Sequence, residues 1–200
     1  KRSVAAAKAC NGLVFSGCGT DQLDPANARG VDDVIRAYEE QIEAIEAAGG
    51  RIVLMASRAL AKVARSTDDY AKVYGRILQS VREPVIIHWL GDMFDPALAG
   101  YWGSADASAM ATAVEIINEH AAKVDGVKIS LLDKDKEIAM RRRLRQGVLM
   151  YTGDDFNYAE LIAGDSEGYS HALLGIFDVI APAASAALAR LAANDNERFH

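Results

Sequence analysis

Short apolar runs alternate along the chain with longer stretches whose apolar residues recur at helical spacing. Six runs have the length and composition of buried strands, and they cover 12–17, 51–57, 84–90, 126–132, 147–153 and 170–177. Helical spacing predicts helices over 31–45, 67–81, 110–117, 138–144 and 183–193. The Gly49-Gly50 pair should end the first of these helices, and Thr67 should cap the second.

Regular alternation of strands and helices predicts a parallel sheet with the helices outside it. The strands are apolar over nearly their whole length, as expected for a sheet that is covered on its faces. A doubly wound sheet and a (β/α) barrel both satisfy this pattern. No G-x-G-x-x-G follows a strand, and "GCGT" at 17–20 lacks the third glycine, so dinucleotide binding is not indicated.

Polar residues at the carboxyl-terminal ends of the strands favour the barrel. They are Thr20, Asp21, Ser57, Arg58, His88, Asp92, Lys128, Ser130, Thr152, Asp154 and Asp155. In a barrel these strand ends converge on one mouth, where active sites lie. We therefore predict an α/β fold, a (β/α)8 TIM barrel, with residues 1–200 as a single partial domain. A closed barrel of this type has eight strands, so we expect its first two β/α units to be absent from this chain.

The composition argues against some classes of binding partner. The 200 residues, half of them hydrophobic and a quarter charged, suit a globular domain with a substantial core. The net charge of −6 argues against a general nucleic-acid binder, since phosphate contacts need clustered Lys and Arg. No apolar run approaches the ~20 residues of a membrane helix. Cys10 and Cys18 form neither a metal-ligand spacing nor a disulfide framework, so a cytoplasmic location is expected.

Lys128 interrupts the apolar run of "KVDGVKISLL" at 123–132. Its stem could be buried while the ammonium reaches solvent, or the whole side chain could point into the barrel. Burial disfavours the charged form and lowers the pKa of a lysine, which makes the neutral amine available as a nucleophile. Such an amine forms a Schiff base with a carbonyl carbon and provides an electron sink for a neighbouring C–C bond.

Several motifs around Lys128 resemble those of one enzyme family. "DGVKIS" at 125–130, followed by "MYTGDDF" at 150–156, is similar to the G-(V/I)-K strand and the next, S-G-D-D strand of the dihydrodipicolinate synthase and N-acetylneuraminate lyase family. "FSGCGT" resembles that family's third strand, "EPVIIHWL" its fifth, and "GYSHALLGIFDVIAP" its eighth strand with the following helix. More specifically, the chain is similar to an uncharacterised branch, a domain of unknown function placed near the synthases.

The resemblance implies a class I aldolase-type lyase or dehydratase that acts on a 2-oxo acid, either pyruvate-like or derived from a sugar. Lys128 would form the imine, without a metal or organic cofactor, and a homo-oligomer would be expected. The family has a proton-relaying Tyr on its fifth strand, where this chain has His88, which can exchange protons near neutrality. His88 would carry a proton while Lys128 stays neutral. The loop that binds the substrate carboxylate belongs on the family's second strand, which we expect to be missing here.

The other polar candidates each have a structural alternative. We expect one of Asp154 and Asp155 at the pocket and the other at the cap of the next helix, because alternation turns the two side chains apart. Trp89 belongs to an aromatic-rich stretch, 88–103, that forms either a lid or wall of the pocket or a packed surface loop. His171 either faces the mouth or has a structural role. The candidate substrate-binding residues are Thr20, Asp21, Ser57, Trp89, Ser130, Thr152, Asp154, Asp155 and His171.

Two other classes of protein stay open. A metal-dependent barrel isomerase or hydrolase would take its ligands from His88, His171, Asp92, Asp154 and Asp155, although these residues have no short-range ligand spacing. A truncated barrel could instead keep the fold without catalysis. In either enzyme class we expect a small-molecule substrate and no nucleic-acid or membrane partner.

Overall fold

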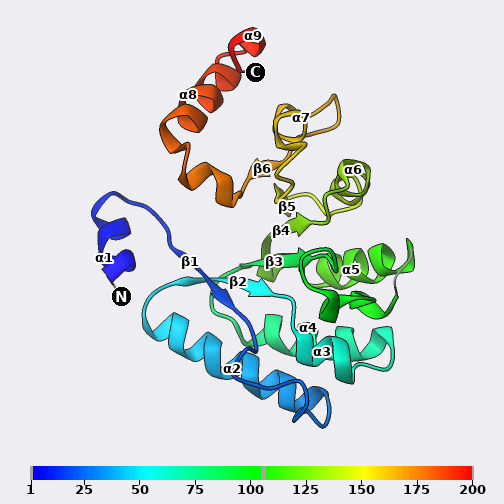
Figure 1. Cartoon of the computed structure of the whole chain (residues 1–200). Helices are drawn as coiled ribbons and strands as arrows, with labels where there is room; N and C mark the ends of the chain where they lie inside the picture. The colour runs from blue at the N-terminus through cyan, green and yellow to red at the C-terminus, as the bar shows by residue number, and fades with distance from the viewer. Residues whose placement is uncertain (1, 105–106, 200) are drawn as a thin grey trace.

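Six parallel strands form one sheet in the computed structural model, which describes residues 2–104 and 107–199. The strands are β1 (Phe15–Cys18), β2 (Arg51–Met55), β3 (Val85–Leu90), β4 (Val124–Ser130), β5 (Leu149–Thr152) and β6 (His171–Ala172). Each strand pairs in parallel with the next strand of the chain, and the sheet twists along its length (Figure 1).

The described helices fall between and after these strands. They are α1 (Arg2–Ala9), α2 (Val31–Ala47), α3 (Arg58–Val63), α4 (Thr67–Ser80), α5 (Ala107–Glu119), α6 (Lys134–Arg141), α7 (Tyr158–Ala163), α8 (Ala181–Ala192) and α9 (Asn196–Phe199). Short 3-10 turns are η1 (Pro96–Leu98), η2 (Tyr101–Gly103), η3 (Ala121–Lys123) and η4 (Gly175–Asp178). Helices α2, α4 and α5 lie together on one side of the sheet (Figure 1), and α2 packs on β1, β2 and α4.

The strand order distinguishes the two predicted architectures. A doubly wound sheet reverses its order at a switch point, whereas a barrel adds each new strand on the same side. The order β1-β2-β3-β4-β5-β6 has no reversal, so the predicted α/β fold of the barrel type is confirmed. Within residues 2–104 and 107–199, no strand pairing joins β6 back to β1, and the sheet is open between them.

Helix α2 illustrates how the apolar spacing becomes packing. Val34, Tyr38 and Ile42 lie one turn apart and are buried on the face that meets the sheet. Two aspartates in its first turn stabilise the helix, because their negative charges lie at the positive end of its dipole. The helix ends where predicted, because Gly49 takes a left-handed conformation with a φ of 79° that a residue with a Cβ rarely adopts.

The main hydrophobic core lies between the sheet and this helical layer. Alternate strand residues such as Leu54, Ile87, Val127 and Ile129 are at most 1% exposed and belong to that core. Because successive side chains of a strand point to opposite faces, the residues between them lie on the other face of the sheet. We call this second face, which is directed away from the helices, the inner face.

Some predicted boundaries differ from the structure. The predicted strand over 170–177 shortens to β6, because the chain turns into η4 soon after Ala172. The predicted strand over 126–132 ends at Ser130, and Leu132 has a positive φ of 52°, which breaks the extended backbone. The short helices α3 and α7 were not predicted, since six residues contain too few turns to show a helical period.

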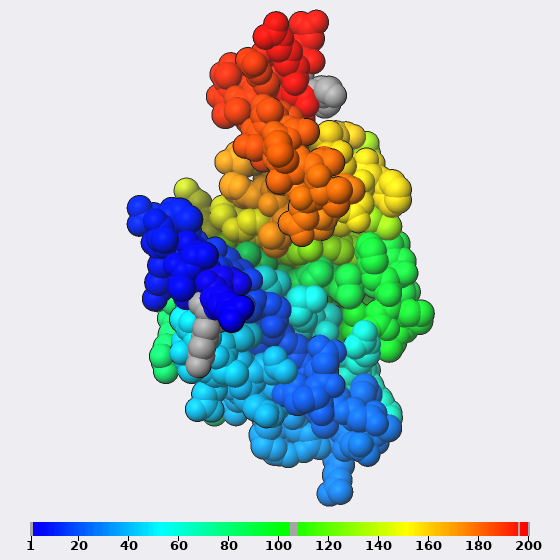
Figure 2. All heavy atoms as spheres, turned by 60° about the vertical axis from the view of Figure 1, so that its left-hand side comes forward, coloured from blue at the N-terminus to red at the C-terminus, as the bar shows by residue number. Residues whose placement is uncertain are grey.

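Helices α8 and α9 extend beyond the rest of the molecule at the carboxyl end of the chain. Figure 2 shows this segment, coloured orange to red, projecting past the strands and helices that precede it. Of the described side chains in α8, Ala184 alone is buried. The alanine-rich helix predicted over 183–193 therefore forms, but it contributes little to the main core.

Gly126 provides a direct test of the close packing on the inner face. A Cβ at this position would lie 2.5 Å from Cε2 of Tyr151 and 2.6 Å from the carbonyl oxygen of Leu149. We expect Gly126→Ala to lower the free energy of unfolding by about 1–3 kcal/mol, because the carbonyl belongs to the sheet backbone and cannot move away cheaply. Urea unfolding followed by circular dichroism measures the change.

Gly175→Ala is the matched control for that substitution. A Cβ there meets no atom within 4 Å, so this variant should unfold at the wild-type urea concentration. Equal stability of the two variants would show that the Tyr151 ring does not lie over Gly126 as described.

Candidate functional site

Five side chains form a continuous row across the inner face. The strand register places Met55 opposite His88, His88 opposite Lys128, Lys128 opposite Tyr151, and Tyr151 opposite His171. Register partners in a parallel sheet point to the same face, with neighbouring strands ~4.8 Å apart. We call this set the cross-strand row, and its members are Met55, His88, Lys128, Tyr151 and His171.

Lys128 stands at the centre of the row, near the carboxyl end of β4. Its neighbours Val127 and Ile129 point to the helical layer, so the lysine points to the inner face, where it is half-buried. Gly153 gives the lysine its space, because a Cβ at this position would lie 2.9 Å from Cε of Lys128. The same added Cβ would overlap the hydroxyl of Ser130.

The surroundings of Lys128 favour its neutral form. Burial lowers the pKa of the lysine below its ordinary value, and the negative charge of Asp155 partly opposes this shift. A larger fraction of the side chain is therefore present near neutrality as the free amine, which is the nucleophilic form.

His88 is buried beside Lys128 and contacts two side chains. Its Nε2 lies 3.0 Å from Oγ of Ser130, and its Nδ1 lies 3.4 Å from Sδ of Met55. Burial, and secondarily the charge of Lys128, lower the pKa of His88 to about 3. His88 is therefore neutral near pH 7, which corrects the expectation that it carries a proton while Lys128 stays neutral.

Asp154 and Asp155 have the separate roles that alternation suggested. The buried Asp154 carboxylate accepts hydrogen bonds from the backbone N–H groups of Phe156 and Asn157, both at 2.9 Å, and so holds the turn before α7. Asp155 is exposed and acts on Lys128 through its charge. Asp155 is thus the member of the pair that is associated with the lysine.

Two of the predicted substrate-binding residues lie on the wrong face. Trp89 points to the helical layer, where its ring centroid lies 6.1 Å from that of Trp102, because it alternates with His88 along β3. Thr152 likewise points away from Lys128, and its hydroxyl lies near the buried carboxyl of Glu137. Both residues therefore lie on the face of the sheet opposite to that of Lys128, and Trp89 instead lines a cavity with Leu98 and Tyr101.

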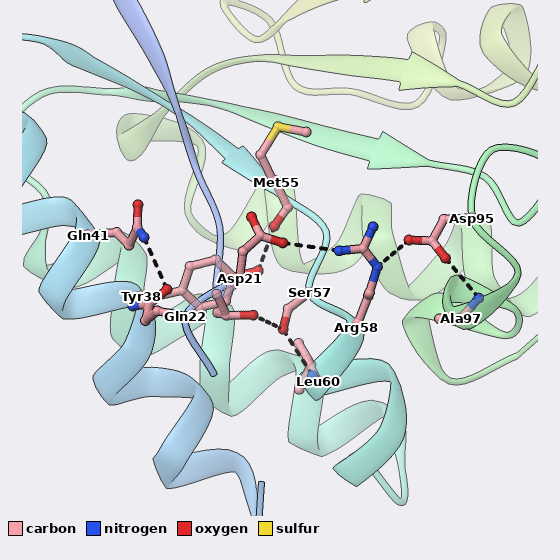
Figure 3. Close-up of polar contacts among 11 residues, drawn as sticks. Asp21, Gln22, Tyr38, Gln41, Met55, Ser57, Arg58, Leu60, Asp95 and Ala97 are labelled. Carbon is pink, nitrogen blue, oxygen red and sulfur yellow. Dashed lines mark hydrogen bonds and ion pairs between the residues drawn. The ribbon is translucent and has the colours of Figure 1, made fainter. Parts of the chain in front are cut away.

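Thr20, Asp21 and Ser57 form part of a polar network at the ends of β1 and β2. The hydroxyls of Thr20 and Ser57 are 2.6 Å apart, and Ser57 accepts a hydrogen bond from the N–H of Leu60 that caps α3. Figure 3 shows Arg58 between the carboxylates of Asp21 and Asp95, with its Nη1 3.1 Å from Asp21. These contacts join the loops after three neighbouring strands.

His171 lies on the inner face two strands from Lys128. Its ring centroid is 5.6 Å from that of Tyr151 and 5.1 Å from that of Tyr169. The prediction that His171 could face the mouth agrees with this placement, but Tyr151 separates it from the lysine in the row.

Sequence reasoning missed Tyr151 and Met55, which flank the His88–Lys128 pair in the cross-strand row. The phenol of Tyr151 donates a hydrogen bond to Oδ2 of Asp125 at 2.7 Å, and burial together with Asp125 raises its pKa. Aligning the strands by their opening glycines, Gly126 and Gly147, would have placed Leu149 opposite Lys128, whereas the observed register pairs Lys128 with Tyr151. No sequence signal identifies Met55 as the neighbour of a histidine nitrogen.

Glu137 was also missed, because helical spacing alone presents it as a surface charge of α6. Only 1% of this residue is exposed, and burial raises the pKa of its carboxyl to about 7. The hydroxyls of Ser170 and Thr152 lie beside it, so it belongs to a polar cluster behind β5 and not to the inner face.

The proposed metal ligands do not gather in space. In the part of the chain that the structure describes, no three His, Cys, Asp or Glu side chains come close enough to hold a metal ion together. Among the described residues, His88, His171, Asp92, Asp154 and Asp155 therefore do not form such a group. Within residues 2–104 and 107–199, no helix has the length and hydropathy to cross a membrane.

Comparison with known proteins places the chain in a family. All of it, residues 1–200, matches the family described as "Protein of unknown function (DUF993)". The chain belongs to this family. A search of the curated proteins found no match to it. The predicted assignment to a branch without a known function is confirmed.

The DUF993 chain shares its fold with synthases and an aldolase. A monomeric variant of dihydrodipicolinate synthase gives a TM-score of 0.68 at 13% identity, over 99% of this chain and 57% of that one. The synthase from Bacillus anthracis gives 0.68 at 14% identity, over 98% and 57%. A variant of 2-keto-3-deoxygluconate aldolase from Sulfolobus solfataricus gives 0.57 at 15% identity, over 92% and 52%. The DUF993 chain thus spans little more than half the length of these proteins.

Asp155 provides a test of the electrostatics around the lysine. Since its charge raises the pKa of Lys128 against the effect of burial, Asp155→Asn should lower that pKa further. The neutral amine would then be populated at lower pH, and the pH at which Lys128 reaches half-maximal acetylation by acetic anhydride should decrease. Mass spectrometry of the labelled peptide measures this profile.

Asp92→Asn is the control, because Asp92 is exposed and does not shift the pKa of Lys128. Its labelling profile should match that of the wild-type chain. An upward shift in Asp155→Asn, or the same shift in both variants, would contradict the assignment of Asp155.

Proposed function

We propose that the protein is a class I aldolase-type lyase or dehydratase that binds a 2-oxo acid as an imine of Lys128. The observation that supports this most is the register of β3 and β4, which sets Lys128 directly opposite His88 on the inner face. A half-buried amine with a lowered pKa, next to a neutral imidazole and a hydroxyl, has the groups that imine chemistry requires.

The chemistry follows from the protonation states of these residues. The neutral amine of Lys128 attacks the C2 carbonyl carbon of the 2-oxo acid, and the carbonyl oxygen takes up a proton to give a carbinolamine. Loss of water then leaves a protonated imine, whose positive nitrogen withdraws electrons from C3. A C–C or C–H bond at C3 can break because its electron pair moves into an enamine and neutralises that charge.

The fold supports this proposal at the level of the whole barrel. Active sites of (β/α) barrels lie at the carboxyl-terminal ends of the strands. Lys128, Ser130 and Asp155 lie at this end of β4 and β5. We further propose that residues 1–200 act as one partial-barrel domain in the cytoplasm, and that the protein forms a homo-oligomer.

Borohydride reduction tests the imine directly. With pyruvate as the probe, reduction should attach a stable adduct to Lys128, because hydride converts the imine into a secondary amine that cannot hydrolyse. Peptide mass spectrometry locates the modified residue. Lys128→Ala should lose the adduct, and His88→Phe should keep it while pyruvate-dependent turnover slows by roughly 10²–10⁴-fold.

Lys123→Ala is the matched control, because Lys123 lies just before β4 and its Nζ donates a hydrogen bond to the carbonyl oxygen of Val81 at 2.7 Å. This variant should form the adduct as the wild-type chain does. If no adduct forms, or if Lys128→Ala forms it equally well, the proposed mechanism is wrong.

A further inference from the structure

The contact between His88 and Met55 favours one of the two neutral tautomers of the imidazole. A thioether sulfur has no hydrogen and can only accept a hydrogen bond. The Nδ1 of His88 lies 3.4 Å from Sδ of Met55, so a hydrogen bond at this contact requires the proton on Nδ1. In a neutral imidazole the other nitrogen, Nε2, is then without a proton and acts as an acceptor.

The tautomer fixes the direction of the second contact. Nε2 of His88 lies 3.0 Å from Oγ of Ser130, and Ser130 is 4% exposed. Because Nε2 is the acceptor, the hydroxyl of Ser130 is the donor. Its oxygen keeps lone pairs that can accept a proton from another group, so the hydroxyl can pass a proton on to the imidazole.

Ser130 also lies near the side chain of Lys128. It follows Lys128 by two residues on β4, so both side chains point to the inner face. A Cβ on Gly153 would overlap both groups, because it would clash with Oγ of Ser130 and lie 2.9 Å from Cε of Lys128. The hydroxyl therefore lies within hydrogen-bond distance of the imidazole and near the end of the lysine side chain.

We propose that Ser130 is a further catalytic residue, whose hydroxyl transfers protons between the imine on Lys128 and Nε2 of His88. This inference rests on the proposed function, since it needs the imine. When C3 of the bound 2-oxo acid loses a proton, Oγ of Ser130 takes up that proton while its own hydroxyl proton moves to Nε2. The electron pair of the C–H bond becomes the enamine double bond, and the C=N pair returns to nitrogen.

The net charge of the site does not change when His88 accepts this proton. The positive charge of the protonated imine disappears as the enamine forms, and it reappears on the imidazolium of His88. Repulsion from a charged Lys128, the smaller of the two causes that lower the pKa of His88 at rest, is therefore absent at this moment, whereas burial, the larger cause, persists.

Nitrogen-15 NMR of histidine-labelled protein tests the direction of the hydrogen bond without any substrate. The chain has 4 histidines, and the signals lost in His88→Phe identify His88. We expect a neutral ring with the proton on Nδ1 over the whole range from pH 5 to pH 8, because its pKa is about 3. A proton on Nε2 would make Ser130 the acceptor and would overturn the relay.

Exchange of the pyruvate methyl protons in D2O tests the relay itself, in parallel with borohydride trapping. Ser130→Ala should keep the Lys128 adduct while exchange slows by roughly 10²–10⁴-fold. Ser130→Thr keeps the hydroxyl and should restore most of the exchange. The double variant with His88→Phe should be no slower than His88→Phe alone, because residues that act as one unit are non-additive.

The outcomes separate the two proposals. Wild-type exchange in Ser130→Ala, or losses that add in the double variant, would show that Ser130 only packs against His88. An adduct without exchange in the wild-type chain would contradict the relay and leave the imine intact. Absence of the adduct from the wild-type chain would overturn the proposed function, and the relay with it.

Discussion

The parallel register between β3 and β4 is the constraint on which the candidate site depends. Backbone hydrogen bonds set His88 opposite Lys128, and the alternation of side chains then sends both to the inner face. A shift of one residue would turn the lysine into the helical core and bring Val127 or Ile129 to the site. The apolar core thus determines which side chains reach the inner face, because burying Ile87, Val127 and Ile129 leaves one orientation for the polar residues between them.

Burial gives these polar residues their properties and requires that they have partners. Lys128 and His88 lose hydration on the inner face, and both pKa values decrease. Met55 and Ser130 each contact one of the two imidazole nitrogens, so that both nitrogens have a partner. Gly153 keeps open the space that the lysine and the hydroxyl share. The row is therefore held by packing and hydrogen bonds at once, so that its central residues have little freedom to move apart.

Much of this arrangement could be predicted from the sequence. The strands and long helices follow from apolar spacing, and strict β/α alternation with polar strand ends favoured the barrel over a doubly wound sheet. The inward orientation of Lys128 follows from alternation within β4. The protonation of His88 could not be predicted, because it depends on burial and on Met55, a residue 33 positions away in the chain. Alternation along β3 also predicts that Trp89 faces the helical layer, as it does, whereas Thr152 was misplaced because its position near a strand end does not show which face of the sheet it occupies.

The most direct test of the account is a crystal structure of the chain after reduction with borohydride in the presence of pyruvate. We expect continuous electron density from Nζ of Lys128 into the space on the inner face, with the reduced adduct within about 3 Å of Oγ of Ser130. His88 should keep its contacts to Met55 and Ser130 in that structure. An adduct on a different lysine, or one on Lys128 that points away from His88 and Ser130, would contradict the central claim that the cross-strand row is the site of imine chemistry.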